Sequence, residues 1–483
     1  MRYNIILNIL GMMSKYIGAL FVIPVICAIL LKENSAIIPF LATGIVAIAF
    51  GFLLTIKKAE QKEIDNIKKS ESLTTVFFAW ILFALICTIP YLFYGMDFTN
   101  ASFEAMSGVT TTGASIMDDY SIYPKTLFFF RSLTQWFGGM GIVVLFIAVL
   151  PKISVAGRQM FYAEAPTPTE DKPTPRIRYT ASWLWGIYLT LTLIELVILK
   201  FLGLDLFDAT ITSISTIATG GFLHMQNSVY DFHNSSISLC VAIFMFIAGI
   251  NYILIYRGLK QKKITHIFKS EEFRWYMIIT AFLTFLLAGS LYINSHLEIK
   301  KAILNSFFEI SATMTSTGFA VDNYINWDAT SKVILFLAFF TGGCATSTSG
   351  GIKIIRWIFI GKYLKRELNK IMHPQGVYPI KLEGAPVGHD IISQMVAFVI
   401  FYIVIFALGA FLIVLIENNA TIALSSSAAA IGNIGPAFGV LGPMDSFNSL
   451  HLLTKWVLIL LMLIGRLEII PFLAILNRDL WKN

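Results

Sequence analysis

Charged residues are scarce in this sequence. Asp, Glu, Lys and Arg together make up 13% of the chain, whereas hydrophobic residues make up 56% and the mean hydropathy is +0.73. A soluble domain carries charge on about a quarter of its residues, because its surface must be solvated. The composition therefore excludes a soluble globular protein and predicts a membrane protein.

The sequence also lacks the groupings that mark metal centres, disulfides, nucleotide sites and active sites. The four cysteines lie in apolar stretches without metal spacing or an evident pairing, and the histidines show no ligand spacing. No phosphate-binding glycine motif follows a strand. No nucleophile is paired with a base at membrane depth. We therefore expect no cofactor and no nucleotide bound to this chain, and an intramembrane enzyme is disfavoured.

Long apolar runs are abundant instead, and a helix needs about 20 apolar residues to cross a bilayer. The first run is too long for a signal peptide and is split by Lys15, so it is predicted to be a retained helix. A tenth run, Val333 to Ile360, is interrupted. The nine continuous runs are Ile5 to Leu31, Ala36 to Thr55, Leu73 to Tyr94, Leu127 to Leu150, Trp183 to Leu202, Ile237 to Tyr256, Trp275 to Ile293, Ile391 to Ile416 and Leu452 to Leu476.

The positive charge is distributed in a pattern typical of membrane topology. The net charge is +7, and its lysines and arginines gather in four alternate connections, at 57–69, 152–178, 257–274 and 362–381. The positive-inside rule assigns such connections to one cytoplasmic face. Both termini, with Arg478 and Lys482, then lie on the same face. The distribution favours ten spans and argues against a nucleic-acid partner.

The connections on the opposite side share a repeated pattern. Each contains an apolar stretch too short to span, followed by small and hydroxyl residues around a glycine, and the copies recur roughly every 100 residues. Phe103-Glu104 and Phe308-Glu309 occupy the same offsets in two copies. The aligned glycines are Gly113, Gly220, Gly318 and Gly435.

This pattern predicts a cation selectivity filter. Short helices that stop inside the membrane direct their partly negative C-terminal ends at a pore. Carbonyls of the extended segment after each helix can replace an ion's hydration shell, and glycine accepts the backbone angles this requires. A single Thr-Gly pair would be an ordinary turn, but four copies at equivalent places make that reading improbable. The predicted ion-binding residues are Thr111, Thr112, Gly113, Ala218, Thr219, Gly220, Ser316, Thr317, Gly318, Asn433, Ile434 and Gly435.

The predicted fold is an all-α polytopic membrane protein with ten spans. Two peripheral N-terminal helices precede four helix–pore helix–filter–helix repeats in pseudo-four-fold arrangement. The predicted units are 1–56, 70–157, 179–260, 273–370 with a broken second helix, and 388–483.

The interrupted run is the clearest sign of a mechanism outside the filters. Residues 341–351 contain four glycines and several hydroxyl residues, which disfavour a helix and predict an intramembrane loop. The alternative is a helix-packing surface of small residues. Arg466 lies within the last span, where buried charge is costly. We expect it to bind the loop carbonyls or repel cations; the alternative is an interfacial anchor.

Acidic residues follow each filter or lie in its helix. A negative vestibule formed by Asp118, Asp119, Asp231, Asp322, Asp328 and Asp445 would concentrate cations, although each aspartate alone is more simply a solvated loop residue. For Glu104 and Glu309 we expect hydrogen bonds to backbone behind the filter, because a carboxylate touching the ion would slow its exit.

These motifs resemble the Trk/Ktr/HKT superfamily of potassium transporters, over almost the whole chain. The two extra N-terminal spans favour its Trk branch. The matching segments are Met106 to Ala114, Ile214 to Phe222, Thr315 to Phe319, Gly432 to Pro436, Gln135 to Gly141, Gly350 to Lys353, and Gly465-Arg466.

The resemblance implies potassium-selective uptake across the bacterial inner membrane, a homodimer with one pore per subunit, and a separate cytoplasmic nucleotide-binding regulatory subunit. Filter glycines in all four repeats resemble the potassium-selective pattern, whereas a serine in the first resembles the sodium-passing plant branch. The fourth filter has Asn433-Ile434 without threonine, so the innermost site should be weaker.

The resemblance also supports an intramembrane gate. A sodium-permeable or weakly selective channel on the same fold is the alternative, and channel-like flow or symport with sodium or protons both stay open. A receptor or scaffold would not need four filters. The gate residues are Gly342, Gly343, Thr346, Ser347, Gly350, Gly351, Lys353 and Arg466.

Overall fold

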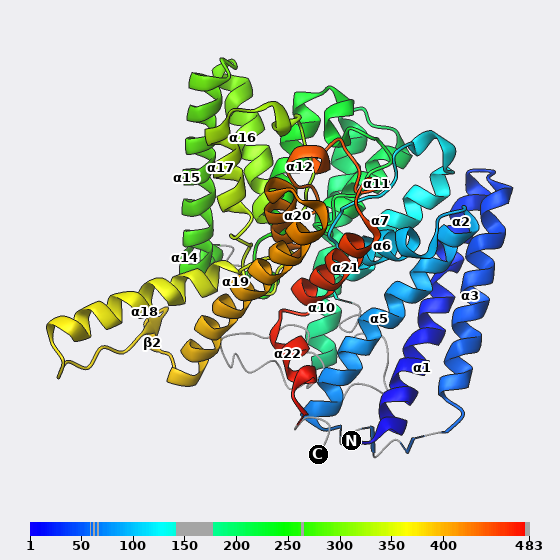
Figure 1. Cartoon of the computed structure of the whole chain (residues 1–483), viewed down its shortest axis with the longest axis horizontal. Helices are drawn as coiled ribbons and strands as arrows, with labels where there is room; N and C mark the ends of the chain where they lie inside the picture. The colour runs from blue at the N-terminus through cyan, green and yellow to red at the C-terminus, as the bar shows by residue number, and fades with distance from the viewer. Residues whose placement is uncertain (58, 61–62, 65–66, 142–176, 262–264, 479–483) are drawn as a thin grey trace.

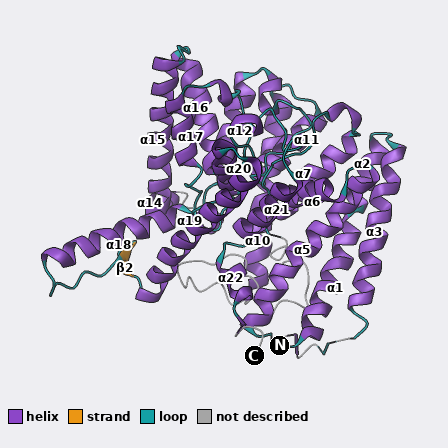
Figure 2. Cartoon of the chain, in the orientation of Figure 1, coloured by secondary structure: helices purple, strands orange, loops and turns teal. Residues whose placement is uncertain are grey.

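The computed structural model describes residues 1–57, 59–60, 63–64, 67–141, 177–261 and 265–478 (Figure 1). Helices form almost all of its regular structure (Figure 2). Within these residues the strands are β1 (Lys381–Leu382) and β2 (Ala385–Pro386), which pair antiparallel in one short hairpin. The prediction of an all-α protein is confirmed.

The N-terminal helices lie together at one edge of the molecule (Figure 1, blue). They are α1 (Tyr3–Leu20), α2 (Val22–Leu30) and α3 (Asn34–Leu54). A Cβ atom added to Gly18 would lie 2.7 Å from the carbonyl oxygen of Gly44, so only glycine permits this approach of α1 to α3. Small residues at such crossings are what bring helix backbones together in membranes.

Four repeats follow, each with an outer helix, a short pore helix and an inner helix. A 3₁₀ turn precedes the inner helix in every repeat. The first has α5 (Lys69–Phe93), α6 (Phe98–Val109), η1 (Tyr120–Ile122) and α7 (Lys125–Gly139); the second α10 (Ile177–Phe201), α11 (Leu206–Ile217), η3 (Ser228–Phe232) and α12 (Ser235–Ala248); the third α15 (Glu271–Asn294), α16 (Ile299–Met314), η4 (Tyr324–Asn326) and α17 (Ala329–Ala338); the fourth α19 (His389–Glu417), α20 (Ala420–Gly432), η5 (Gly439–Leu441) and α21 (Leu452–Arg466).

The pore helices are short and start at defined caps. They contain 12, 12, 16 and 13 residues, fewer than a span requires. Asp97, Asp205 and Asn419 accept hydrogen bonds from first-turn N–H groups of α6, α11 and α20. Such caps satisfy donors that the helix itself cannot.

The repeats pack in a cycle. At three of the four junctions the inner helix of one repeat contacts the pore helix of the next, with α7 on α11, α12 on α16, and α21 on α6. The last contact joins the fourth repeat to the first. The pore helices therefore surround one central region.

Two inner helices are interrupted. The run Ile237 to Tyr256, predicted to be one span, is bent, since α12 and α13 (Tyr252–Lys260) meet at 88°. Asn251 stands at the bend, where it accepts hydrogen bonds from Ile253 and Leu254 and starts a new helix. The interruption predicted in the third repeat is present, since α17 ends at Ala338 and α18 (Ile354–Met372) starts after the loop. Figure 1 shows α18 (yellow) extending away from the repeats.

Six helices of the described residues are long and apolar enough to cross a membrane, or seven if the bent pair α12–α13 is one span. The run Leu127 to Leu150 continues beyond residue 141, so part of it lies outside the described residues. The count of ten spans stays a prediction. Two short helices, α14 (Thr265–Lys269) and α22 (Ile470–Leu476), complete the fold.

Candidate ion pathway

Each pore helix ends in the same hydrogen-bonded turn. Thr112 donates its N–H to the carbonyl of Ser107 at 2.8 Å, back across the helix end. Such a bond closes the C-terminus of a helix and turns the chain sharply. The equivalent bonds run from Gly220 to Ser215 (3.0 Å), from Thr317 to Ala312 (2.8 Å) and from Ile434 to Ala429 (2.9 Å).

Every turn also contains two residues with positive φ, separated by one residue. In the first repeat these are Thr111 at 55° and Gly113 at 84°. Non-glycine residues rarely adopt this region, so its recurrence at four equivalent sites marks one conserved geometry within the chain. The other pairs are Thr219 and Gly221, Ser316 and Gly318, and Asn433 and Gly435.

This geometry corrects the alignment of the second repeat by one residue. Gly221, with φ of 83°, is the equivalent of Gly113, and Gly220 is the equivalent of Thr112. Ala218 then corresponds to Thr110, outside the ring. The sequence shows adjacent glycines at 220 and 221, and only the backbone angles tell them apart.

The four turns form a closed ring. A Cβ atom added to any of the turn glycines would collide with a carbonyl oxygen of the next repeat. The contacts run through all repeats and return to the first, as four segments around one axis require. The pairs of glycine and carbonyl are Gly113 with Gly220, Gly221 with Thr317, Gly318 with Ile434, and Gly435 with Thr112.

The ring is not four-fold equivalent in its side chains. Thr112 and Thr317 hydrogen-bond to Thr110 and Thr315 at 2.8 and 2.7 Å, whereas Gly220 and Ile434 offer no hydroxyl. In the fourth repeat the Asn433 amide donates to the Thr112 hydroxyl at 3.0 Å and to the Met462 carbonyl. The amide therefore joins the first and fourth repeats at the inner end of the ring.

Recesses lie on both sides of the ring. The outer one, about 480 Å³ including space open to solvent, is lined by Gly113, Gly221, Gly318 and Asp445. The inner one, about 980 Å³ on the same measure, is lined by Asn433. The filter turns thus separate two spaces that can hold water and ions.

Most aspartates of the predicted vestibule accept hydrogen bonds from other residues of the protein. Asp118 accepts from Ser446 and Asn448, and Asp328 caps α17 through Ser331. The Ser121 hydroxyl and N–H hold the pKa of the exposed Asp119 carboxyl below its usual range. Asp445 is the vestibule aspartate that lines the outer recess, so the simpler reading of loop residues fits the others.

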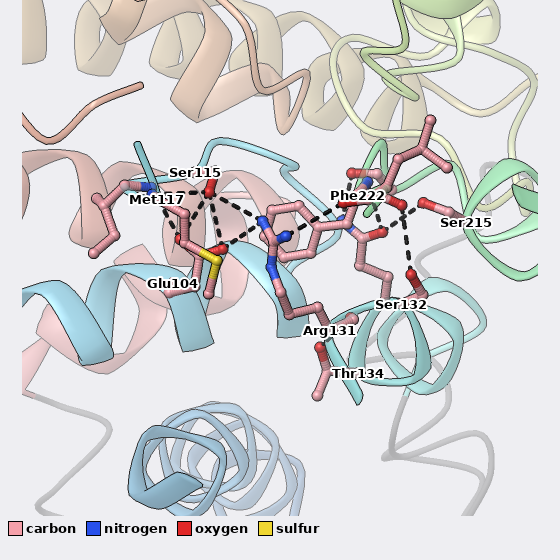
Figure 3. A network of polar contacts seen from close by, with 12 residues as sticks. Glu104, Ser115, Met117, Arg131, Ser132, Thr134, Ser215 and Phe222 are labelled. Carbon is pink, nitrogen blue, oxygen red and sulfur yellow. Dashed lines mark hydrogen bonds and ion pairs between the residues drawn. The ribbon is translucent and has the colours of Figure 1, made fainter. Parts of the chain in front are cut away.

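A buried ion pair supports the first filter from behind (Figure 3). Arg131 of α7 lies 2.6 Å from the Glu104 carboxylate, and both side chains are at most 1% exposed. Glu104 also accepts the N–H of Ile116 at 3.0 Å, and Glu309 accepts that of Val321 at 2.9 Å. The expectation that both glutamates bind backbone behind the filter is confirmed, although Arg131 was not foreseen.

Arg131 also reaches the second filter. Its guanidinium donates to the Leu223 carbonyl at 3.3 Å and lies 4.1 Å from the centre of the Phe222 ring. Figure 3 shows Arg131 beside Phe222. Gln135, one turn further along α7, donates to the Gly220 carbonyl at 2.5 Å and accepts the Phe222 N–H. The inner helix of the first repeat thus fixes the filters of two repeats. Gln135 belongs to a motif noticed in the sequence, but its role needed the fold.

The intramembrane loop lies directly under the ring. The N–H of Gly350 donates to the Ser316 hydroxyl of the third filter at 2.6 Å, and the Thr348 hydroxyl donates to the Ile217 carbonyl at 3.2 Å. The loop folds onto itself through Gly343, which donates to the Ser349 hydroxyl at 3.1 Å. Thr346, Ser347, Gly350 and Gly351 line the inner recess, while Gly342 bonds to the Ile352 carbonyl.

Arg466 joins this loop to the first repeat. Its guanidinium donates to the Thr348 carbonyl at 3.1 Å and to the Gly138 and Gly139 carbonyls at the end of α7, at 2.7 Å for Gly139. The side chain lines the inner recess. This placement differs from that of an interfacial arginine pointing to water.

Two further cations lie beside the loop. The buried Lys353 ammonium donates to the Ser349 carbonyl. Arg356 pairs with Glu468 and lies 3.6 Å from the centre of the Phe398 ring. Glu468 therefore pairs with a side chain of α18.

The geometry defines the class: a helical membrane protein in which four repeats build one pore-like filter. The family model for TrkH, described as a cation transport protein, matches residues 37–479. The chain is 34% identical to the Trk system potassium uptake protein TrkH of Escherichia coli K12 over all of both chains. It is 29% identical to TrkG of that organism, with 95% of each chain covered.

A solved structure agrees with these relatives. The crystal structure of the potassium transporter TrkH from Vibrio parahaemolyticus is 30% identical and superimposes with a TM-score of 0.89 over all of both chains. This chain belongs to the TrkH family of cation transport proteins, and it is a transport protein of the membrane rather than an enzyme.

Proposed function

We propose that this protein takes up potassium across the membrane through the ring of filter turns. The observation that carries the proposal is the cyclic contact between turn glycines and carbonyl oxygens of the next repeat. Rings of backbone carbonyls can take the place of a cation's hydration shell. The related proteins are named for potassium uptake, which supports potassium as the substrate.

The proposed ion ligands come from three positions of each turn. They comprise the two positive-φ residues and the residue between them. Compared with the residues predicted from the sequence, this set includes Gly221 and excludes Ala218. The set is Thr111, Thr112, Gly113, Thr219, Gly220, Gly221, Ser316, Thr317, Gly318, Asn433, Ile434 and Gly435.

Ion flux into liposomes that hold the purified protein tests the substrate, with potassium, rubidium, sodium and lithium compared at zero voltage. We expect potassium and rubidium to pass faster than sodium and lithium. The missing hydroxyls at Gly220 and Ile434 favour a second candidate, a weakly selective cation channel. Equal sodium and potassium flux would select that candidate, and no flux of any ion would contradict both.

The proposed gate consists of the loop residues Gly342, Gly343, Thr346, Ser347, Gly350 and Gly351, together with Lys353 and Arg466. The loop under the ring would block the path, and the guanidinium of Arg466 would repel cations while it holds Thr348. Arg466→Ala removes the hydrogen bonds to Thr348, Gly138 and Gly139, so we expect basal flux to rise by about tenfold or more. Selectivity should not change, because the filter turns are separate.

Arg466→Lys should recover only part of the closed state, because lysine keeps the charge but loses the planar fork. Arg366→Ala, which removes a cation from α18 that pairs with Glu367, is the matched control. Wild-type basal flux in Arg466→Ala would contradict the gate and leave the filter proposal standing.

We further propose a homodimer whose cytoplasmic face binds a separate nucleotide-binding regulatory subunit. The basic connections at 257–274 and 362–381 support a cytoplasmic placement of that face, with both termini on it and the protein in the bacterial inner membrane. The third expected contact segment, 152–178, lies almost wholly outside the described residues. Light scattering of the purified protein tests the dimer, and a pull-down from native membranes that recovers no soluble protein would contradict the regulator.

A further inference from the structure

The cytoplasmic connection between the second and third repeats starts and ends at the intramembrane loop. Asn251 stands at the bend between α12 and α13, and Glu272 lies in the first turn of α15. The chain between them forms α13 and α14. The Asn251 amide donates to the Glu272 carboxylate at 3.3 Å, so the two ends of the connection are hydrogen-bonded to each other.

Both residues hold the first half of the loop. The Glu272 carboxylate accepts the N–H of Ala345 at 2.6 Å, and the Asn251 side-chain oxygen accepts the Thr346 hydroxyl at 2.6 Å. The Gly249 carbonyl, exposed by the bend, accepts the N–H of Cys344 at 2.8 Å. Three consecutive loop residues are therefore bound by one bend and one carboxylate.

These bonds matter for the position of the loop because several of their partners are buried. Glu272 is 6% exposed and Cys344 is fully buried. A carboxylate that accepts a backbone N–H forms a stronger bond than a neutral acceptor. Since the loop has no helical hydrogen bonds of its own, its position depends on such partners.

Glu271, the residue before Glu272, binds the helix that follows the loop. Glu271 pairs with Lys362 of α18 at 2.5 Å, and the same ammonium donates to the Lys381 carbonyl at 2.7 Å. Adjacent residues at the start of α15 thus bind the first half of the loop and the helix that follows it. The start of α15 fixes the loop relative to both.

We propose that Asn251 and Glu272 form a latch that holds the loop closed under the filter. The inference rests on the proposed gate and extends it to two residues outside the loop, neither of which lines the ion path described above. They are positioning residues, since they act on the ion path only through the loop.

The natural Cys344 reports the state of the latch directly, without any flux measurement. In the full chain in nanodiscs, a membrane-permeable thiol reagent followed by mass spectrometry gives the labelling rate of each cysteine. Glu272→Ala and Asn251→Ala should each raise the rate of Cys344 by about tenfold, the shift expected when one hydrogen bond that holds the loop is lost. The buried Cys87 of α5 is the internal control and should keep its rate.

Glu272→Gln is the matched control, because it keeps an acceptor for Ala345 while it removes the charge. We expect a smaller rise than in Glu272→Ala. A rise at Cys87 in step with Cys344 would indicate general unfolding and overturn the latch. Wild-type labelling of Cys344 in both alanine variants would overturn it as well.

Liposome flux of the same variants separates the latch from the gate. Increased labelling with increased basal flux supports both. Increased labelling with unchanged flux supports the latch and contradicts the loop as the gate. If Arg466→Ala raises flux while the latch variants change neither readout, the gate stands and the latch is wrong.

Discussion

The first and third repeats share their filter chemistry but differ in what supports it. Both have a Phe-Glu pair in the pore helix and a hydrogen bond between threonines two residues apart, Thr110 with Thr112 and Thr315 with Thr317. Behind the first filter, Glu104 pairs with Arg131. The residue at the same spacing from Glu309 is Phe336, and the third inner helix is interrupted.

The difference is between an inner helix held by buried polar contacts and one that is interrupted by a loop. The ion pair and Gln135 tie the inner helix of the first repeat to two filters, so that helix cannot shift without breaking buried polar contacts. The third inner helix instead becomes a loop held by hydrogen bonds to the third filter and to α15. The first repeat thus holds the filter in place. The third repeat, which resembles it in sequence, contains the loop that we propose as the gate.

Loss of the buried cation should show the largest effect on stability. Arg131→Met leaves the Glu104 carboxylate buried without its partner, which costs about 3–5 kcal/mol. Thermal unfolding of the purified protein measures the loss. Adding Glu104→Gln should recover part of it, because the uncompensated charge is gone. If the double variant is less stable than Arg131→Met alone, the pairing does not explain the effect.

Substitution of the filter glycine should reduce ion selectivity equally in the first and third repeats, because their filters share one geometry. Gly113→Ser and Gly318→Ser place a side chain against a carbonyl of the next repeat and at positive φ, a strain of about 1–2 kcal/mol. We expect the potassium-to-sodium permeability ratio to fall by about tenfold, measured as liposome flux. An unchanged ratio in Gly113→Ser would contradict the first filter assignment.

The corrected register of the second repeat gives a sharper version of this test. Gly221→Ser should reduce selectivity as Gly113→Ser does. Gly220→Ser would meet the Gln135 side chain but has an ordinary φ, so it lacks the backbone strain and its effect should be smaller. The reverse order would restore Gly220 as the filter glycine.

The contact between loop and third filter should have a modest effect. Ser316→Ala removes the acceptor for the Gly350 N–H, a change of about 1–3 kcal/mol for an unsatisfied buried donor. We expect basal flux to increase severalfold without loss of folding. Thr219→Ala, at the equivalent position of the second repeat where the hydroxyl bonds to Ala218, is the control.

The smallest effect should come from Glu309, for which the described residues include no ion pair. Glu309→Gln keeps an oxygen to accept the Val321 N–H, so the unfolding free energy should change by no more than about 1 kcal/mol. Thermal unfolding compares this variant with Arg131→Met. A loss as large as that of Arg131→Met would remove the contrast between the repeats.

Much of the architecture could be predicted from the sequence, because the bilayer imposes strong rules. Apolar runs, alternate basic connections and repeated Thr-Gly segments predicted the helices, the four filters and the interrupted helix. Arg466 was recognised because charge within a span is costly and needs a partner. These features depend on composition and spacing, which the chain displays directly.

The partners of the site residues needed the tertiary structure. Arg131 meets Glu104, and Glu272 meets Ala345, across sequence separations of 27 and 73 residues that no local pattern records. The bend at Asn251 lies within an apolar run that reads as a continuous span, and the choice between Gly220 and Gly221 depends on backbone angles. The sequence by itself determined the helices and the kind of filter, since hydrophobicity and glycine act locally. The packing of distant segments alone decided which side chains hold the filter and the loop, because buried polar groups take their partners from whatever the fold brings within hydrogen-bond distance.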